Sequence, residues 1–158
     1  MITYRIVRSK YTRDLSGYGA ELWGGRWNFV GRPVLYASSH ASLALLEILA
    51  WTTLSQVLKA DFSLMTIETP DEPMEVIKAH DLPKDWYYPE NIQITQKMGT
   101  DWLKKTKSLM LMVPSALLPI EYNLLINPRH PSMEKVKIQD VSQLSLDPRL
   151  VNNKGAGR

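Results

Sequence analysis

Residues 24–47 read GGRWNFVGRPVLYASSHASLALLE, and most of what the sequence indicates follows from this stretch. It carries Arg26 directly after two glycines, Tyr36 between apolar residues, and Glu47 in the middle of a leucine-rich run. An unpaired carboxylate buried among leucines is costly, so Glu47 needs a partner, a proton or a cavity to face. We therefore expect Arg26, Tyr36 and Glu47 to face one pocket.

The local pattern predicts a strand that runs straight into a helix. Residues 32–39 are typical of a strand, and residues 39–54 of a helix with Ser39 as its N-cap. Glu47 follows Leu43 by four residues and precedes Trp51 by four, which places it on the apolar side of that helix. Because the end of a strand lies near the first turns of the helix that follows it, we expect Tyr36 and Glu47 to flank one cleft.

Each of these residues also has a purely structural interpretation. Glu47 could be satisfied by a neighbouring arginine or amide, and Tyr36 could be a core tyrosine with a bonded hydroxyl. Arg26 could stack on Trp23 or Trp27. Against this, a guanidinium in the open space beside two glycines suits a phosphate or carboxylate, which it can hold through two hydrogen bonds.

The rest of the chain predicts strands mixed irregularly with a few helices. This favours a single α+β domain with small mixed or antiparallel sheets and flanking helices. The glycine-rich residues 14–33 are expected to form loop and short strand, and residues 133–141 fit either a strand or a short helix. Further strands are expected at residues 2–7, 60–70, 108–115 and 121–128, a helix at 92–105 with Gly99 as a weak point, and loops at 71–90.

Composition excludes several classes of protein. The 158 residues include no cysteine, so the chain has neither disulfides nor thiolate metal ligands, and the three histidines lack metal-ligand spacing. We expect no metal. There is no apolar run of signal-peptide or membrane-span length, so a cytoplasmic protein without membrane association is expected. The net charge of +3 is poor evidence for nucleic-acid binding. The polar, glycine-rich residues 151–158 are expected to be a disordered tail.

Three segments resemble the RES-domain family, which is named for its arginine, glutamate and serine. Residues 17–47, GYGAELWGGRWNFVGRPVLYASSHASLALLE, resemble the N-terminal signature of that family. Residues 113–131, VPSALLPIEYNLLINPRHP, resemble its serine segment and the following strand, and LDPRL at 146–150 resembles its C-terminal end. The resemblance implies that residues 1–150 form a RES-like NAD-binding catalytic domain.

The resemblance implies a fold, an activity and a partner. RES proteins are toxins of bacterial type II toxin–antitoxin pairs, with an Xre-type helix-turn-helix antitoxin, and their fold is similar to ADP-ribosyltransferase toxins. They consume NAD by hydrolysis or phosphorolysis of its bond to nicotinamide, and some transfer ADP-ribose to a protein. The resemblance implies NAD as the substrate, an antitoxin over the cleft, and a homodimer as a plausible assembly.

The family residues fall on particular positions of this chain. Its arginine corresponds to Arg26, its tyrosine to Tyr36, its glutamate to Glu47 and its serine to Ser115. By itself, a serine at the end of a strand is an ordinary turn residue, and an alignment slip could place the family serine at Ser108 or Ser132. The following roles are then expected: Glu47 stabilises positive charge on the ribose, Arg26 holds the pyrophosphate, Tyr36 stacks on the nicotinamide or ribose side, and Ser115 donates a hydrogen bond to substrate.

Two other functions remain open from the sequence. The first is an ADP-ribosyltransferase that modifies a protein, which shares the bond-breaking step and differs only in the acceptor. The second is a non-catalytic RNA-binding module that uses Trp23, Trp27 and Tyr36 as stacking platforms. The RNA-binding function leaves Glu47 unexplained, so we expect no direct nucleic-acid binding by this chain alone.

Overall fold

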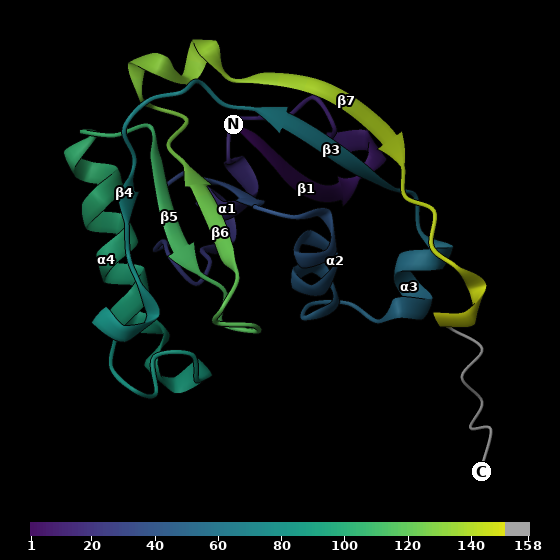
Figure 1. The fold of residues 1–158 in the computed structure, drawn as a ribbon, viewed down its shortest axis with the longest axis horizontal. Helices are drawn as coiled ribbons and strands as arrows, with labels where there is room; N and C mark the ends of the chain where they lie inside the picture. The colour runs from purple at the N-terminus through teal and green to yellow at the C-terminus, as the bar shows by residue number, and fades with distance from the viewer. Residues whose placement is uncertain (151–158) are drawn as a thin grey trace.

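The computed structural model describes residues 1–150, and the tail expected at 151–158 lies outside the described residues. Within that range a seven-stranded sheet has the order β4-β5-β6-β2-β1-β3-β7 (Figure 1). Its strands are β1 (Ile2–Arg8), β2 (Leu35–Ser38), β3 (Phe62–Glu68), β4 (Glu75–Val76), β5 (Met110–Pro114), β6 (Tyr122–Ile126) and β7 (Lys137–Gln143). The helices are α1 (Tyr18–Trp23), α2 (Ala41–Leu49), α3 (Leu54–Lys59) and α4 (Ile92–Lys105). This mixture confirms the predicted α+β class.

The sheet is antiparallel apart from the short parallel pair β4–β5. β1 pairs with β3 along its whole length, but it meets β2 at the single register pair Tyr4↔Ser38. The junction between β1 and β2 is therefore a seam, and on either side of it the two groups of strands diverge in Figure 1. Helix α2 follows β2 directly and lies in the angle between the two groups.

Strand register decides which side chains share a face of the sheet. Side chains alternate along a strand, so Tyr36 and Ser38 lie on one face of β2, and Leu35 and Ala37 lie on the other. Leu35 and Ala37 belong to a buried core with Met65, Met110 and Ile126. On the opposite face, Ser38 pairs with Asn123 of β6, which places these two polar side chains directly across from each other.

Most of the predicted elements are confirmed, and the differences have local causes. The helix predicted at residues 92–105 has those bounds, and residues 133–141 resolve into a short 3-10 helix followed by β7. The glycine-rich region holds α1, which was expected to be loop, closed by Gly24 at φ 70°. The prediction of Ser39 as the N-cap of α2 is wrong. The N-cap is His40, which makes no side-chain cap bond. The Ser39 hydroxyl donates instead to the carbonyl of Tyr122.

Gly99 has a different role from the weak point that the sequence suggests. It lies on the face of α4 that contacts the loop after α1, and a Cβ built on it would come within 2.0 Å of the Trp27 carbonyl oxygen. No side chain fits between these two backbones. Gly99 therefore allows α4 to approach the loop that carries Arg26.

We predict that Gly99→Ala lowers the free energy of unfolding by about 2 kcal/mol, because the added methyl forces two backbones apart and outweighs the better helix propensity of alanine. Urea denaturation would measure this. The matched control is Gly19→Ala in α1, where a Cβ would meet no atom within 4 Å. The control should keep or gain stability, and equal midpoints for the two variants would contradict the close-approach role.

Candidate active site

Glu47 lies half-buried near the end of α2, and its carboxylate is held from the sheet. Its Oε1 atom accepts hydrogen bonds from Ser115 Oγ at 2.7 Å and from Asn123 Nδ2 at 2.5 Å. Within residues 1–150 no hydrogen bond reaches Oε2. The predicted need for a partner is confirmed, and the partners are a hydroxyl and an amide rather than a cation.

Ser115 is fully buried just after β5, and all of its hydrogen-bonding capacity is used. Its oxygen accepts from the backbone N–H groups of Leu117 and Leu118 at 3.1 and 3.2 Å, and its hydrogen goes to Glu47. A hydroxyl has one hydrogen and two lone pairs, so nothing is left over for a second ligand. In this structure Ser115 is therefore directed at Glu47.

The two other serines considered from the sequence lie in different surroundings. Ser108 accepts a hydrogen bond from Trp102 Nε1 at 2.8 Å and donates to Glu75. Ser132 lies in the 3-10 helix Pro131–Lys135, where its N–H donates to His130 Nδ1. Neither of them contacts Glu47.

Arg26 lies on the loop between α1 and β2, and α4 holds that loop by its backbone. The Arg26 carbonyl accepts from Thr95 Oγ1 at 2.7 Å, and the Gly25 carbonyl accepts from Gln96 Nε2 at 3.0 Å. The guanidinium, half-exposed, donates one hydrogen bond, from Nη1 to the carbonyl of Trp86 at 3.2 Å. Among residues 1–150 the backbone at Arg26 is thus fixed, while most of the guanidinium donors have no partner.

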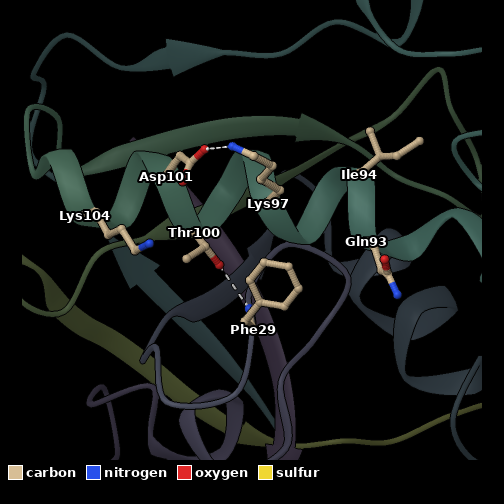
Figure 2. Close-up of a pocket in the computed structure, with 7 residues that line it drawn as sticks. All are labelled: Phe29, Gln93, Ile94, Lys97, Thr100, Asp101 and Lys104. Atoms are coloured by element: carbon tan, nitrogen blue, oxygen red, sulfur yellow. Dashed lines mark hydrogen bonds and ion pairs between the residues drawn. The ribbon is translucent and has the colours of Figure 1, made fainter.

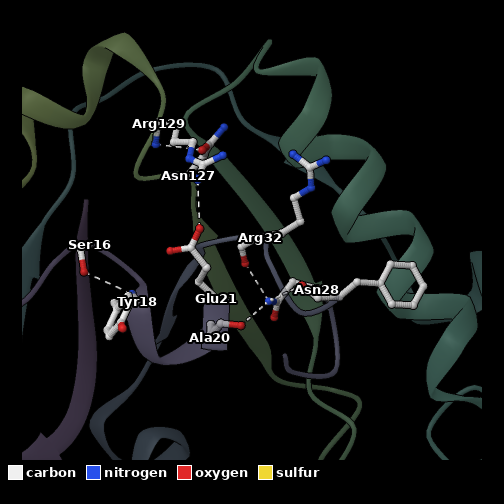
Figure 3. Close-up of polar contacts among 9 residues, drawn as sticks. Ser16, Tyr18, Ala20, Glu21, Asn28, Arg32, Asn127 and Arg129 are labelled. Atoms are coloured by element: carbon white, nitrogen blue, oxygen red, sulfur yellow. Dashed lines mark hydrogen bonds and ion pairs between the residues drawn. The ribbon is translucent and has the colours of Figure 1, made fainter. Parts of the chain in front are cut away.

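Asn28 and Tyr36 fix the same loop from inside. Asn28 is fully buried, and its Nδ2 atom donates to the carbonyls of Ala20 and Arg32, both at 2.8 Å (Figure 3). Its Oδ1 atom accepts from the Tyr36 hydroxyl at 2.8 Å, and that hydroxyl accepts from the Trp27 N–H at 3.0 Å. The Tyr36 hydroxyl therefore connects the strand to the loop, which leaves only its ring to meet a ligand.

The electrostatics of the three predicted residues show that they lie near one another. Burial lowers the pKa of Arg26, and the charges of Glu47 and Tyr36 oppose that shift. Burial raises the pKa of Tyr36 above its ordinary value, an effect that Arg26 counters and Glu47 adds to. Arg26 and Tyr36 thus lie within electrostatic range of Glu47, and their convergence on one ligand stays a prediction.

Two side-chain roles considered from the sequence, stacking of a base on Trp27 and stacking of Arg26 on a tryptophan, are not supported. Trp27 is buried against Trp86, with ring centroids 6.1 Å apart, so it offers no stacking platform to a base. Within residues 1–150 the cation–π contacts involve Arg8 and Lys10, and none involves Arg26. No group of three or more metal-ligating side chains and no helix able to cross a membrane occurs in this part of the chain.

An open hollow of about 560 Å³ lies elsewhere, where α4 meets Phe29 of the loop after α1 (Figure 2). Phe29, Ile94 and Lys97 are among the residues that line it, and Lys97 is paired with Asp101 there. It includes none of the four residues predicted for the site. Of the predicted residues, Ser115 and Glu47 share a hydrogen bond, and Arg26 and Tyr36 lie within electrostatic range of Glu47. The hollow on α4 is a separate feature.

Sequence reasoning missed three polar residues that build the site. Asn28, Thr95 and Asn123 each bond a predicted residue or its backbone. The positions of the two asparagines in the sequence could have indicated their roles. Asn28 ends the run GGRWN, and Asn123 interrupts an apolar strand in EYNLLI. Asparagine is depleted in strand interiors, so one there suggests a specific partner.

We predict that Tyr36→Phe lowers the free energy of unfolding at neutral pH by about 1–2 kcal/mol, because the Trp27 N–H and Asn28 Oδ1 lose their partner. Above about pH 10 the unfolded chain ionises Tyr36 while the folded chain keeps it neutral, so the stability it contributes is lost as pH rises. Urea denaturation against pH should show the parent and the variant converging there. Tyr18→Phe, at an exposed position, should match the parent at every pH, and a constant gap for Tyr36→Phe would contradict the assignment.

Comparison with known proteins gives matches over nearly the whole chain. The RES domain family model matches residues 2–148. "Toxin Res" of Photorhabdus laumondii is 39% identical over 157 residues, which cover 98% of this chain and 99% of that protein. "Toxin Res" of Yersinia enterocolitica is 42% identical over 153 residues, which cover 95% and 99%.

A third relative and a solved structure extend the comparison. The "Prs ADP-ribosylating toxin" of Sphingobium sp. is 38% identical over 148 residues, which cover 92% of this chain and 91% of that protein. A chain in the crystal structure of the M. tuberculosis MbcT–MbcA toxin–antitoxin complex has the same fold, with a TM-score of 0.76 at 24% identity over 94% of this chain and 85% of that one. By its matched length and its relatives, this chain belongs to the RES domain family.

Proposed function

We propose that this chain is the toxin of a type II toxin–antitoxin pair and that it degrades NAD by cleaving the bond between nicotinamide and ribose. The observation that carries the proposal is the carboxylate of Glu47, held through one oxygen, with its other oxygen free of hydrogen bonds among residues 1–150. Arg26 and Tyr36 lie within electrostatic range of it. The toxin names of the relatives support the same class of function.

The chemistry requires one carboxylate rather than two. Nicotinamide in NAD is already a cationic leaving group, so no general acid is needed to protonate it. Cleavage develops positive charge on the ribose, as in other oxocarbenium-like transition states. A fixed carboxylate beside that ribose stabilises the charge as it forms, and its partial removal from water strengthens the effect. Glu47 supplies this group.

Arg26 and Tyr36 have binding roles in this proposal. The Arg26 guanidinium, with most of its donors unused, holds the pyrophosphate through charge-assisted hydrogen bonds. Tyr36 presents its ring to the nicotinamide or ribose side, because its hydroxyl is committed to the loop. Ser115 acts through Glu47, since its hydrogen is already donated to that carboxylate.

A second candidate function is transfer of ADP-ribose to a protein, and the Sphingobium relative favours it by name. The bond-breaking step and the site are the same, and only the acceptor differs: water, phosphate or a protein side chain. The acceptor decides between the two functions.

The proposed partner is a helix-turn-helix antitoxin of the Xre type, which covers the site. Two large apolar side chains near the site are each 81% exposed: Trp51 follows the helix of Glu47, and Ile120 lies between Ser115 and β6. Exposed apolar groups beside a polar site suit a protein partner. The MbcT–MbcA structure is itself a toxin–antitoxin complex. A homodimer remains a prediction of the family resemblance.

We predict that Glu47→Gln reduces the rate of NAD loss by about a hundredfold or more, because the amide keeps the shape but not the charge that stabilises the transition state. Arg26→Ala should mainly raise the KM for NAD. Both would be measured by enzymatic assay of NAD with purified protein and by cellular NAD after induction. The matched controls are Glu90→Gln and Arg13→Ala at exposed positions, which should behave as the parent. NAD loss at the parental rate in Glu47→Gln would refute the assignment.

We predict that labelled NAD yields free or phosphorylated ADP-ribose rather than labelled protein when the purified chain is incubated with NAD, phosphate and a cell extract. Free ADP-ribose would indicate hydrolysis, and phosphorylated ADP-ribose would indicate phosphorolysis. Label that appears on one protein band and depends on Glu47 would instead establish the transferase function.

A further inference from the structure

The two carboxylate oxygens of Glu47 differ in their hydrogen bonds. Both donors, Ser115 Oγ and Asn123 Nδ2, reach Oε1, and within residues 1–150 none reaches Oε2. The donors come from different segments: Ser115 directly follows β5, and Asn123 lies in β6. Two donors on one oxygen fix the rotation of the carboxylate and leave the other oxygen available.

Asn123 has no freedom to turn its amide. It pairs across the sheet with Ser38 of β2, and the Ser38 hydroxyl donates to Asn123 Oδ1 at 2.7 Å. With Oδ1 occupied by a donor, Nδ2 faces the carboxylate of Glu47. The opposite amide orientation would place Oδ1 against Oε1, two acceptors in contact, and would cost the desolvation of both.

The position of the pair explains why such a polar contact is tolerated in the sheet. Ser38 is 4% exposed, and Leu124 beside Asn123 is fully buried on the other face. A buried polar group needs every partner in place, and here each donor has an acceptor: Ser38 to Asn123, and Asn123 to Glu47. The chain of bonds ends at Oε1 of Glu47, and Oε2 has no hydrogen bond among residues 1–150.

We infer that Asn123, oriented by Ser38, is a positioning residue for Glu47, and that with Ser115 it aims Oε2 at the ribose of the substrate. This inference rests on the proposed function, because it assigns the orientation of the carboxylate that acts there. Asn123 works through Glu47 and needs no contact with substrate.

The test is Asn123→Asp, which keeps the shape and replaces the donor by a second carboxylate beside Glu47. Two carboxylates this close share a proton, so the acid limb of the pH–rate profile for NAD cleavage should move up by about one pH unit or more. At neutral pH, kcat should fall about tenfold or more with little change in KM. The matched control is Gln139→Glu on β7, an exposed amide 3.4 Å from Glu68, which should keep the parental profile.

A second pair of variants tests the orienting role of Ser38. Ser38→Ala releases the Asn123 amide and should lower kcat in the same sense, by several-fold. Ser39→Ala, at the adjacent position where the hydroxyl donates to the Tyr122 carbonyl, should not lower it. Urea denaturation of each variant shows whether a loss of rate reflects unfolding, and the shift in pH profile is a change that simple unfolding does not produce.

The outcomes separate the two proposals. If the parent consumes NAD and Asn123→Asp keeps its kcat and pH profile, the positioning role is wrong and the proposed function stands. If the parent leaves NAD intact, the proposed function fails. In that case the carbon-13 resonance of the Glu47 carboxyl can still be followed against pH: titration at higher pH in Asn123→Asp supports the contact, and coincident curves overturn it.

Discussion

The site depends on the carboxylate of Glu47, which is held against one face of the sheet by Asn123 of β6 and by Ser115 just after β5. A half-buried charge on the apolar side of a helix is stable only where donors meet it. Here the donors are a hydroxyl and an amide, neither of which neutralises the charge. The two bonds therefore fix the orientation of the carboxylate without adding a cation beside it.

The other part of the site is the loop that carries Arg26, which is held by α4, Asn28 and Tyr36. Helix α4 bonds the backbone of the loop through Thr95 and Gln96, and the absence of a side chain at Gly99 allows that approach. Asn28 binds three carbonyls of the loop region and the hydroxyl of Tyr36. With its backbone fixed in this way, Arg26 can offer a guanidinium to an anion without a large loss of chain entropy on binding.

The fold class, most strands and the helix at 92–105 could be predicted from the sequence, as could the need of Glu47 for partners. These follow from local periodicity and from the cost of an isolated carboxylate. The sequence does not predict the partners of Glu47, because Ser115 and Asn123 lie 68 and 76 residues further along the chain. Only the register of β6 against β2 shows that Asn123 faces the helix. Likewise, the sequence around Gly99 shows only a residue of poor helix propensity. The structure shows that the missing side chain lets α4 approach the backbone of Trp27.

The order of strands has a consequence for the newly made chain. β6 lies between β5 and β2, yet it is synthesised long after β2 and α2. A ribosome-bound fragment that ends before residue 123 contains Arg26, Tyr36 and Glu47 but not the strand that orients the carboxylate. Since synthesis runs from the N-terminus, the site is completed only when β6 enters the middle of the sheet. The Glu47 carboxylate therefore lacks its Asn123 donor until most of the chain has been translated.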